Sequence, residues 1–458
     1  MGDTLYYILC GLCVGFVLLG INLMSKVKLS VKGNALSALA MVLAIGITAV
    51  LTVAKCGGGF LIPVAVALAI GAVVGVTGAA KAKMIAMPQI IALLNGLGGA
   101  ASALVAGVTA IQGGAGAFED LTAGLALAIG ALTLTGSLVA AGKLARILDA
   151  KPKYLPRHTL LTGLLALGCV LAVLLQTLSG GWAIATALLA LALGVVFVMR
   201  VGGADMPITI SLLNALSGVA GGIAGMAVNE PLLVVVGGIV GASGLILTQD
   251  MCRAMNRKLI AILTGKTTVS AAPAPEAPVS EAPVEAEKLT MEAVGAKLRE
   301  AKKVIIVPGY GMALSQAQGE VAALASTLEK RGAEVKFAIH PVAGRMPGHM
   351  SVLLCEADID YEKLFMMEDI NEEFASCDIA LVIGANDVTN PAANTAEGTP
   401  IYGMPVLSVE DAPMAVFCNF DTKPGYAGVP NPLYEADNVL LMLGDAKESV
   451  DRLRSLLY

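Results

Sequence analysis

A stretch of thirteen residues occurs twice in this chain, as MPQIIALLNGLGG at 87–99 and, without a gap, as MPITISLLNALSG at 206–218. Each copy opens an apolar run and has proline at its second position, where the first turn of a helix leaves the backbone N–H unused. Asn95 and Asn214 each follow that proline by seven residues, about 10 Å along a helix that rises 1.5 Å per residue. The repeat therefore predicts two parallel helices with an amide at the same depth.

Two interpretations of these amides are open. Asparagine is a common interhelical hydrogen-bonding residue in membrane bundles, whereas polar side chains within a membrane also mark ion and proton pathways. The duplication and the equal depth favour a polar conduction path through Asn95 and Asn214. Asp205, just before the second copy, is either an ordinary interfacial carboxylate or the cytosolic mouth of that path.

The two copies belong to a series of nine apolar runs, each close to the ~20 residues that cross a hydrocarbon core of ~30 Å. The chain has 458 residues, of which 56% are hydrophobic and 14% charged. A polytopic all-α membrane domain follows, because lipid offers no hydrogen-bond partner to an open backbone. The runs cover roughly residues 4–24, 34–54, 60–80, 89–112, 121–142, 158–178, 181–199, 207–228 and 231–249.

Lysine and arginine gather in alternate connections between the runs, for example at 26–32, 143–157 and 253–258. The excess of positive charge on one side predicts that the N-terminus lies outside and the C-terminal half in the cytosol. No Asp, Glu, Lys or His lies in the middle of a run. A proton route would therefore need hydrated asparagines or a titratable group supplied by a partner.

An Ala/Pro-rich segment at 266–288 has neither helical nor strand periodicity, which predicts an extended linker. It separates a membrane domain at 1–265 from a domain of ordinary soluble composition at 289–458.

The soluble half contains KVIIVPGYGMALSQAQ at 303–318. This pattern of strand, G-x-G turn and helix is the context in which a dinucleotide pyrophosphate rests on a helix N-terminus. The fingerprint is incomplete, because Leu314 occupies its third glycine position. The next strand, at 334–339, ends without the acid that binds a ribose 2′-hydroxyl, and Arg345 follows, which favours NADP over NAD.

Further apolar strands are expected at 378–387, 404–409, 414–419 and 438–443, with a last helix at 446–457. Together they predict an α/β Rossmann-like domain with an open, mostly parallel sheet. The loops at 384–387 and 425–428 follow strand ends, where such sheets hold ligands, although ordinary turn chemistry explains either loop equally well.

The charge of the chain argues against a nucleic-acid-binding protein, and its cysteines argue against a metal site. The net charge is −5, and no stretch dense in lysine or arginine provides a surface for nucleic acid. The eight cysteines fall mostly in apolar runs and suit a reducing compartment. Cys10 and Cys13 form a CxxC inside a predicted span without a second ligand pair, so no metal site is expected.

Seven motifs together resemble the family of beta subunits of proton-translocating NAD(P) transhydrogenase. They are GYGMALSQAQ (309–318), HPVAGRMPGHM (340–350), GANDVTNPAAN (384–394), GYAGVPNPLY (425–434), GDAK (444–447), GGADMP…SLLN (202–214) and MCRAMNR (251–257). The resemblance covers nearly the whole chain. It implies a Si/Re-specific enzyme of the bacterial inner (cell) membrane, in which hydride passes between NADH on a partner alpha subunit and NADP⁺ on 289–458 while protons cross the membrane domain. It also implies a dimer of the heteromeric unit.

The resemblance also implies a set of cofactor-binding residues and no catalytic side chain, since hydride passes directly between the nicotinamides. Arg345 and its loop would approach the phosphates, and Asp387 and Tyr426 would close loops over the dinucleotide. The expected NADP(H)-binding residues are Gly309, Tyr310, Gly311, Met312, Ala313, Arg345, Gly384, Asn386, Asp387, Lys423, Gly425 and Tyr426.

The chain departs from the family pattern at two places. Where other members have a Lys-Arg pair that grips the 2′-phosphate, this chain has Asn419 and Phe420, with Lys423 as the nearest cation. Where many members have a proton-carrying histidine, this chain has Asn95, which implies a separate, membrane-spanning alpha polypeptide. The competing class is a membrane channel or transporter gated by a nucleotide-sensing domain.

Overall fold

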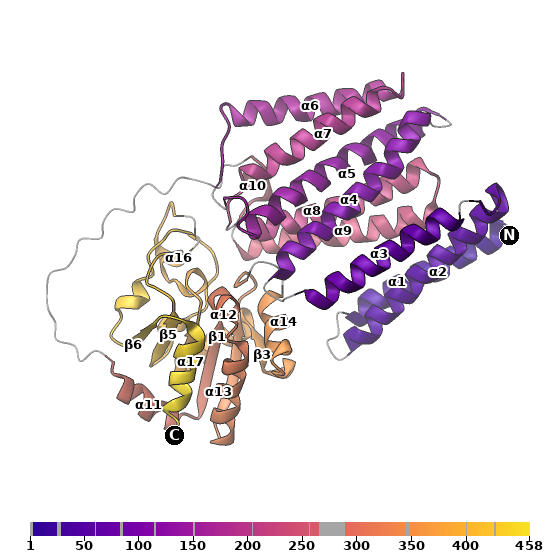
Figure 1. Cartoon of the computed structure of the whole chain (residues 1–458). Coiled ribbons are helices and arrows are strands. Elements are labelled where there is room, and N and C mark those ends of the chain that lie inside the picture. Colours follow the sequence, from indigo (N-terminus) through magenta and orange to yellow (C-terminus); the bar gives the residue numbers. More distant parts are fainter. Residues whose placement is uncertain are drawn as a thin grey trace. The chain divides into compact units, whose positions relative to one another are not determined.

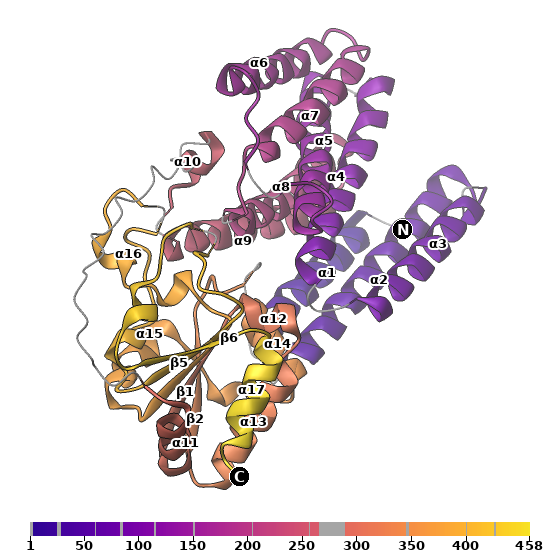
Figure 2. The same cartoon turned by 60° about the vertical axis from the view of Figure 1, so that its left-hand side comes forward.

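The computed structural model describes residues 3–24, 29–59, 61–82, 86–113, 116–149, 152–203, 205–255, 257–264, 289–344, 348–399, 401–425 and 427–458. The chain divides into two compact units, whose elements are drawn in Figures 1 and 2. One unit comprises Met1–Leu148, Tyr154–Met199 and Ser211–Ile246, and the other comprises Asp149–Lys153, Arg200–Ile210 and Leu247–Tyr458. The expected linker at 266–288 lies outside the described residues.

Nine helices of the described residues are long and apolar enough to cross a membrane. They are α1 (Asp3–Met24), α2 (Ser30–Cys56), α3 (Leu61–Lys81), α4 (Met87–Gln112), α5 (Ala117–Leu144), α6 (His158–Gln176), α7 (Trp182–Met199), α8 (Met206–Ala227) and α9 (Pro231–Ala254). Each matches one predicted run, and most ends differ by a few residues. The prolines of the repeat lie in the first turns of α4 and α8, as their missing N–H predicts.

Glycines allow the membrane helices to approach at backbone distance. A Cβ placed on Gly99 of α4 would lie 2.7 Å from the carbonyl oxygen of Gly130 on α5, and one on Gly130 would lie 2.5 Å from that of Gly99. On α7, a Cβ at Gly194 would lie 2.4 Å from the carbonyl oxygen of Leu132. These distances leave no room for a side chain, so α4, α5 and α7 pack through their smallest residues.

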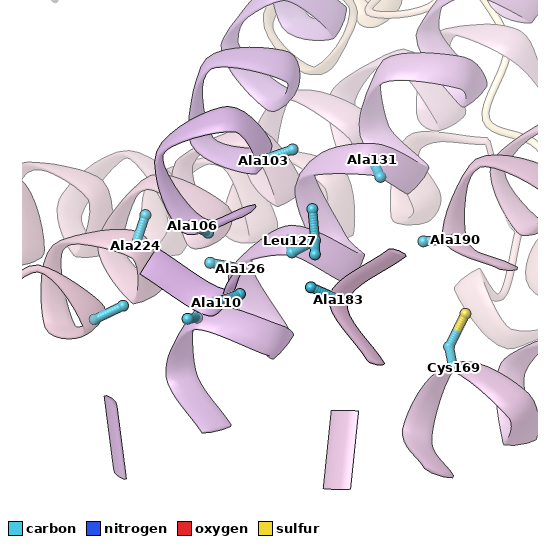
Figure 3. Close-up of a cluster of buried hydrophobic side chains, with 12 residues drawn as sticks. Ala103, Ala106, Ala110, Ala126, Leu127, Ala131, Cys169, Ala183, Ala190 and Ala224 are labelled. Carbon is cyan, nitrogen blue, oxygen red and sulfur yellow. The ribbon is translucent and has the colours of Figure 1, made fainter. Parts of the chain in front are cut away.

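The interior of this unit consists mainly of alanine. Figure 3 shows the cluster in which Ala103, Ala106 and Ala110 of α4 meet Ala126, Leu127 and Ala131 of α5. Ala183 and Ala190 of α7 and Cys169 of α6 extend it. Small side chains of this kind bring the helix axes together and leave the larger apolar residues facing outward, where lipid can receive them.

The first three helices are packed less closely. Gly20 of α1 and Gly33 of α2 meet at backbone distance, but none of the residues of α3 is buried. A cleft of about 860 Å³ lies between α1, α2 and α3 on one side and α9 on the other. Its lining is almost wholly apolar apart from Ser37, Thr48, Thr52 and Glu230, and the Glu230 carboxylate accepts a hydrogen bond from the hydroxyl of Tyr6.

The soluble part of the second unit is built on a six-stranded sheet with the order β3-β2-β1-β4-β5-β6, in which all neighbouring strands are parallel. The strands are β1 (Lys303–Pro308), β2 (Glu334–Ile339), β3 (Leu364–Met366), β4 (Ile379–Ile383), β5 (Ala415–Asn419) and β6 (Val439–Leu443). The central strands β1 and β4 are buried along nearly their whole length, as a sheet covered on both faces requires.

The helices of this unit are α10 (Leu259–Thr264), α11 (Met291–Glu300), α12 (Tyr310–Ser315), α13 (Gln318–Lys330), α14 (His349–Glu356), α15 (Met367–Ile370), α16 (Ala392–Thr395) and α17 (Ala446–Ser455). Thr290 caps α11 by accepting a hydrogen bond from the N–H of Ala293 at 3.2 Å. The helix expected after the G-x-G turn is broken into α12 and α13, because Gln316 adopts a left-handed conformation with φ of 53°.

One predicted strand is wrong and one was missed. Residues 404–409 form no strand; Pro405 has no N–H to donate, and Leu407 donates instead to the carbonyl of Val388 in the loop after β4, at 2.9 Å. The position beside β4 belongs to β5. The missed strand is β3, which has only three residues and is too short to show the alternation on which strand prediction depends.

Candidate functional site

A cleft of about 450 Å³ opens at the carboxyl ends of β1, β4 and β5. The strand order reverses between β1 and β4, and open α/β sheets hold their ligands at this point because the flanking loops diverge there. The cleft is lined by Gly309, Tyr310, Gly311, Leu314, Val342, Ala343, Gly344, Gly384, Ala385, Asn386, Asp387, Val388, Asn419, Phe420, Asp421, Lys423, Pro424 and Gly425.

Three glycines allow two loops to cross at the floor of the cleft. The N–H of Gly309 donates to the carbonyl of Ile383, and that of Gly311 to the carbonyl of Gly384, each at 2.8 Å. A Cβ on Gly309 or Gly311 would lie within 2.6 Å of the backbone of Gly384, whose own φ is +67°. The close crossing of the two loops therefore requires glycine at both positions of the G-x-G pattern. The same glycines expose the backbone at the start of α12, where a phosphate can approach.

The loop after β4 is held against the loop after β5. Asp387 Oδ2 accepts from the N–H of Ala427 at 3.0 Å, and Gly425 lies so close that a Cβ there would meet both carboxylate oxygens at 2.6 Å. The Asn386 amide donates to the carbonyl of Lys423 at 3.1 Å. Burial raises the pKa of the Asp387 carboxyl, and the Ala427 N–H opposes that rise.

On the β2 side of the cleft, a buried histidine holds the segment that follows β2. His340 follows β2 and is buried; its Nδ1 accepts from the N–H of Val342 at 3.2 Å, and its Nε2 lies 2.8 Å from the carbonyl oxygen of Pro405. This pairing requires the neutral tautomer with hydrogen on Nε2. Burial lowers the pKa of His340 to about 4, although the bond to Pro405 and the charge of Glu368 act in the opposite direction.

The predicted cofactor residues fall into three groups. Eight of them line the cleft: Gly309, Tyr310, Gly311, Gly384, Asn386, Asp387, Lys423 and Gly425. Met312 and Ala313 are buried under the turn and are not among the lining residues. Arg345 and Tyr426 lie outside the described residues. Sequence reasoning did not count Leu314 and the segment 342–344 among the binding residues, because they carry no polar side chain.

The sheet order separates the ends of two strands on which the sequence arguments about NADP depend. The strand β2, which ends without an acid, lies on one side of β1 and β4, whereas β5, which ends at Asn419 in place of the family's basic pair, lies on the other.

In the membrane unit, the repeated asparagines lie on the faces through which α4 and α8 meet. A Cβ on Gly98 would lie 3.3 Å from Ser217 Oγ, and one turn further a Cβ on Gly221 would lie 3.7 Å from Ser102 Oγ. Gly98 and Ser217 occupy equivalent positions of the repeat, three residues after the asparagines, and residues at this spacing share a helix face. Asn95 is buried, and Asn214 is half-buried.

The third residue of the predicted path, Asp205, precedes α8 in the other unit. It is buried, and its Oδ1 lies 3.6 Å from Nε of Arg257. Ser137 of α5 was overlooked by sequence reasoning, because serine is ordinary in an apolar span. Its buried hydroxyl has no partner among the described residues, and it packs on Gly96, next to Asn95.

Comparisons with known proteins agree with this architecture. The family model described as NAD(P) transhydrogenase beta subunit matches residues 4–455. Two relatives named NAD(P) transhydrogenase subunit beta, one from Rhodospirillum rubrum and one from a specified strain of that species, are each 40% identical over 406 residues, which is 85% of this chain and 86% of the relative. A channel or transporter gated by nucleotide is not favoured. With nine apolar helices among its described residues and a parallel Rossmann-like sheet, the chain belongs to the family of NAD(P) transhydrogenase beta subunits.

Proposed function

We propose that the cleft at β1, β4 and β5 binds NADP(H) and that its nicotinamide exchanges hydride, with Si/Re stereospecificity, with NADH held on the partner alpha subunit. The observation that carries this proposal is the glycine crossing of Gly309, Gly311 and Gly384 at the reversal point of the sheet. It brings the backbone at the start of α12 to the cleft, where the pyrophosphate would approach. Asp387 Oδ1 is buried at the cleft without a partner among the described residues, which suits a polar group of a bound ligand.

The residues of this chain bind and orient the cofactor, and the cofactor supplies the hydride chemistry. The loops at 384–388 and 419–425, tied together through Asn386 and Asp387, would hold the dinucleotide and exclude water from one side. Met312 and Ala313 would support the turn from below, and Arg345 and Tyr426 would complete the lining. No side chain needs to act as acid, base or nucleophile, because orienting two rings is sufficient.

Proton movement is assigned to the membrane domain at 1–265, and NADP(H) binding to 289–458. The path would run past Asn95 and Asn214, with Asp205 at its cytosolic end. Hydride exchange between two nicotinamides is nearly thermoneutral, whereas one charge crossing 100 mV contributes about 2.3 kcal/mol. Coupling then requires that NADP(H) affinity depend on the proton site, a linkage between two sites.

The alpha partner would include a membrane-spanning polypeptide. The apolar cleft of about 860 Å³ beside α3 and the absence of buried residues in that helix leave a face that one further helix would cover. The small side chains of Ala40, Ala44 and Ala65 line it and permit close helix contact. We place the assembly in the bacterial inner membrane as a dimer of the heteromeric unit, with the N-terminus outside and 289–458 in the cytoplasm.

Reconstitution tests this function. The purified chain alone should transfer no hydride between NADH and an NADP⁺ analogue, because its sequence contains one dinucleotide fingerprint. Adding the alpha subunit should restore hydride transfer, and the pH inside the vesicles should rise or fall as hydride is transferred. Transfer by the chain alone would refute the division between two polypeptides.

A further inference from the structure

The connection between α5 and α6, residues 145–157, combines positive charge with exposed apolar side chains. It contains four basic residues and one acidic residue. Near its start, Ile147 and Leu148 are 82% and 44% exposed, and near its end Tyr154 and Leu155 are 52% and 37% exposed. Water disfavours exposed apolar groups. A surface of this composition suits a layer that is charged on one side and apolar on the other.

Arg146, just after α5, has a backbone conformation that glycine usually adopts. Its φ is 58°. Its N–H donates to the carbonyl of Lys143 at 3.2 Å, and the N–H of Ile147 donates to the carbonyl of Gly142 at 3.0 Å. This pair of bonds ends a helix with one left-handed residue, which is most often glycine and sometimes asparagine. The charge of Arg146 suits the C-terminal end of a helix, but its backbone conformation favours another residue.

Arg157, immediately before α6, departs from local preference in three ways. Its φ of 53° is again left-handed, and its side chain makes no capping hydrogen bond to the helix, whereas serine, threonine, aspartate or asparagine would cap it. Its positive charge also lies at a helix N-terminus, where the backbone N–H groups already carry partial positive charge. Both arginine side chains are exposed, so an anion outside the protein can reach them.

We propose that the connection between α5 and α6 binds acidic phospholipids of the surrounding bilayer. The guanidinium groups of Arg146 and Arg157 donate hydrogen bonds to the headgroup phosphates, for which their planar array of donors is suited. The four exposed apolar side chains lie at the boundary with the acyl chains. Only the crossing of the bilayer by α5 and α6 is required, so lipid binding here does not depend on the nucleotide cleft.

The exposed apolar side chains are held in place at both ends of the connection. The N–H of Leu148 donates to the carbonyl of Gly142 at 2.9 Å, and a Cβ on that glycine would lie 3.0 Å from Leu148 Cδ1. The N–H of Leu155 donates to Nδ1 of the buried His158 at 3.1 Å. The ring of Tyr154 meets the imidazole of His158 edge to face, with centroids 6.0 Å apart. A lipid therefore needs to order little of this surface when it binds.

The other end of α6 shows why charge indicates an acidic lipid. The connection from α6 to α7, residues 177–181, has the sequence TLSGG and no charge, and its Leu178 is 79% exposed. Both connections offer apolar side chains to lipid, but only the one with Arg146 and Arg157 attracts an anion. A free phosphate would pair with the arginines and leave the apolar side chains in water, so a phospholipid fits the surface better.

Lipid titration of the purified full chain in detergent tests this assignment. Phosphatidylglycerol should raise the unfolding temperature, and phosphatidylcholine with the same acyl chains should have little effect. The double variant Arg146→Gly, Arg157→Gly should lose about fivefold in affinity for phosphatidylglycerol per arginine, measured by native mass spectrometry. The double variant Arg146→Lys, Arg157→Lys should still prefer phosphatidylglycerol, because the charge remains. Added salt should weaken the preference of the wild-type chain.

Glycine substitutions separate lipid binding from a structural role. Because glycine adopts a left-handed backbone freely, the glycine double variant should unfold at no lower temperature than the wild type in lipid-free detergent. Asn229→Gly is the matched backbone control, since Asn229 is exposed, uncharged and left-handed with φ of 56°. Lys447→Ala, on α17 of the soluble domain, is the control for loss of an exposed charge. Both controls should leave the response to phosphatidylglycerol unchanged.

Several results would overturn the lipid site. The wild-type chain would respond equally to the two lipids, the glycine double variant would keep the wild-type response, or inorganic phosphate alone would reproduce the shift. Failure of the double variant to co-purify with the alpha subunit, with its lipid response intact, would assign the surface to a protein partner. A lower unfolding temperature of the double variant in lipid-free detergent would assign the two arginines to the stability of the fold.

Discussion

The two parts of this chain build their interiors from different residues. In the membrane unit, ten of the twelve buried members of the cluster in Figure 3 are alanine, and the other two are Leu127 and Cys169. In the soluble domain, the largest fully buried side chains are the rings of Phe337, Phe374 and Phe417. Water drives large apolar groups inward, whereas lipid receives them as readily as a protein interior does, so a membrane core gains instead from close backbone contact.

Buried polar groups differ in the same way. In the membrane helices, Thr122 and Thr133 donate to carbonyls one turn earlier in their own helix, at 2.9 and 2.7 Å. In the soluble domain, buried amides join separate elements: Asn419 reaches the loop after β4, and Asn390 donates to the carbonyl of Pro430 at 3.1 Å. These two hydroxyls are satisfied within their own helix, although Thr135 of α5 also donates to the carbonyl of Leu191 on α7 at 2.8 Å. In the soluble domain, the buried amides hold together the loops that form the cleft.

The largest expected effect concerns the aromatic core. Phe417→Ala, in the middle of β5, should destabilise the soluble domain by about 3–5 kcal/mol, because it leaves a cavity between buried layers. Denaturant unfolding followed by hydrogen exchange of the sheet amides would measure it. A loss below 1 kcal/mol would mean that this core does not depend on its large rings.

The second prediction tests close contact in the membrane unit. Gly130→Val should destabilise it by about 1–3 kcal/mol or more, because the new side chain meets the backbone of α4. The control is Gly75→Val on α3, where a Cβ meets nothing within 4 Å. Thermal stability in detergent should fall in the first variant only. Equal falls would show that valine itself, rather than contact between helices, is responsible.

The third prediction concerns acid. The folded-state pKa of His340 is about 4, below its ordinary value of about 6.5, so the folded state disfavours the proton. The stabilisation from the neutral ring is present above pH 6.5 and is lost as the pH falls towards 4, a change of about 2 kcal/mol between pH 7.5 and 5.

Unfolding free energies at the two pH values should show this loss, and His340→Asn should remove most of the pH dependence. Asp387 acts with the opposite sign, since its raised pKa favours the folded state in acid. An unchanged pH dependence in the variant would assign the effect to other groups.

The last prediction combines the smallest expected loss of stability with a large expected loss of function. Asn214→Leu or Asn95→Leu should cost only about 1 kcal/mol, yet should abolish proton pumping while leaving NADP(H) binding intact, because leucine offers neither donor nor acceptor to a file of water. Vesicles with a pH-sensitive dye provide the readout. If both variants pump the normal number of protons per hydride transferred, the asparagines serve only as contacts between helices.

Sequence patterns revealed most of the fold, because the membrane runs and the buried strands β1, β2 and β4 carry strong periodicity or apolar continuity. They failed where tertiary context decides. The three-residue β3 carries no pattern of its own, and 404–409 has strand composition but lies where β5 already pairs with β4. The break at Gln316 was likewise invisible, since its neighbours are good helix formers.

The candidate site was predictable where glycines and charged residues marked it, and not where its order in space mattered. Gly309 and Gly384 were recognisable from the sequence, but their crossing required the pairing of β1 with β4. Likewise, only the strand order shows that β2 and β5 lie on opposite sides of β1 and β4.

The helices α4 and α8 contact each other at equivalent positions of the repeat. Their contact resembles a homodimer interface, but both partners belong to one chain. An isologous contact uses the same surface on both partners, and here Gly98 faces Ser217 and Ser102 faces Gly221, at equivalent positions of the repeat. In a homodimer, every substitution changes both subunits at once. In a chain with a duplicated helix, a substitution changes only one of the two copies. The two copies have used that freedom, since Asn95 is buried and Asn214 is half-buried. The two members of the pair are therefore distinguishable, although they occupy equivalent positions of the repeat.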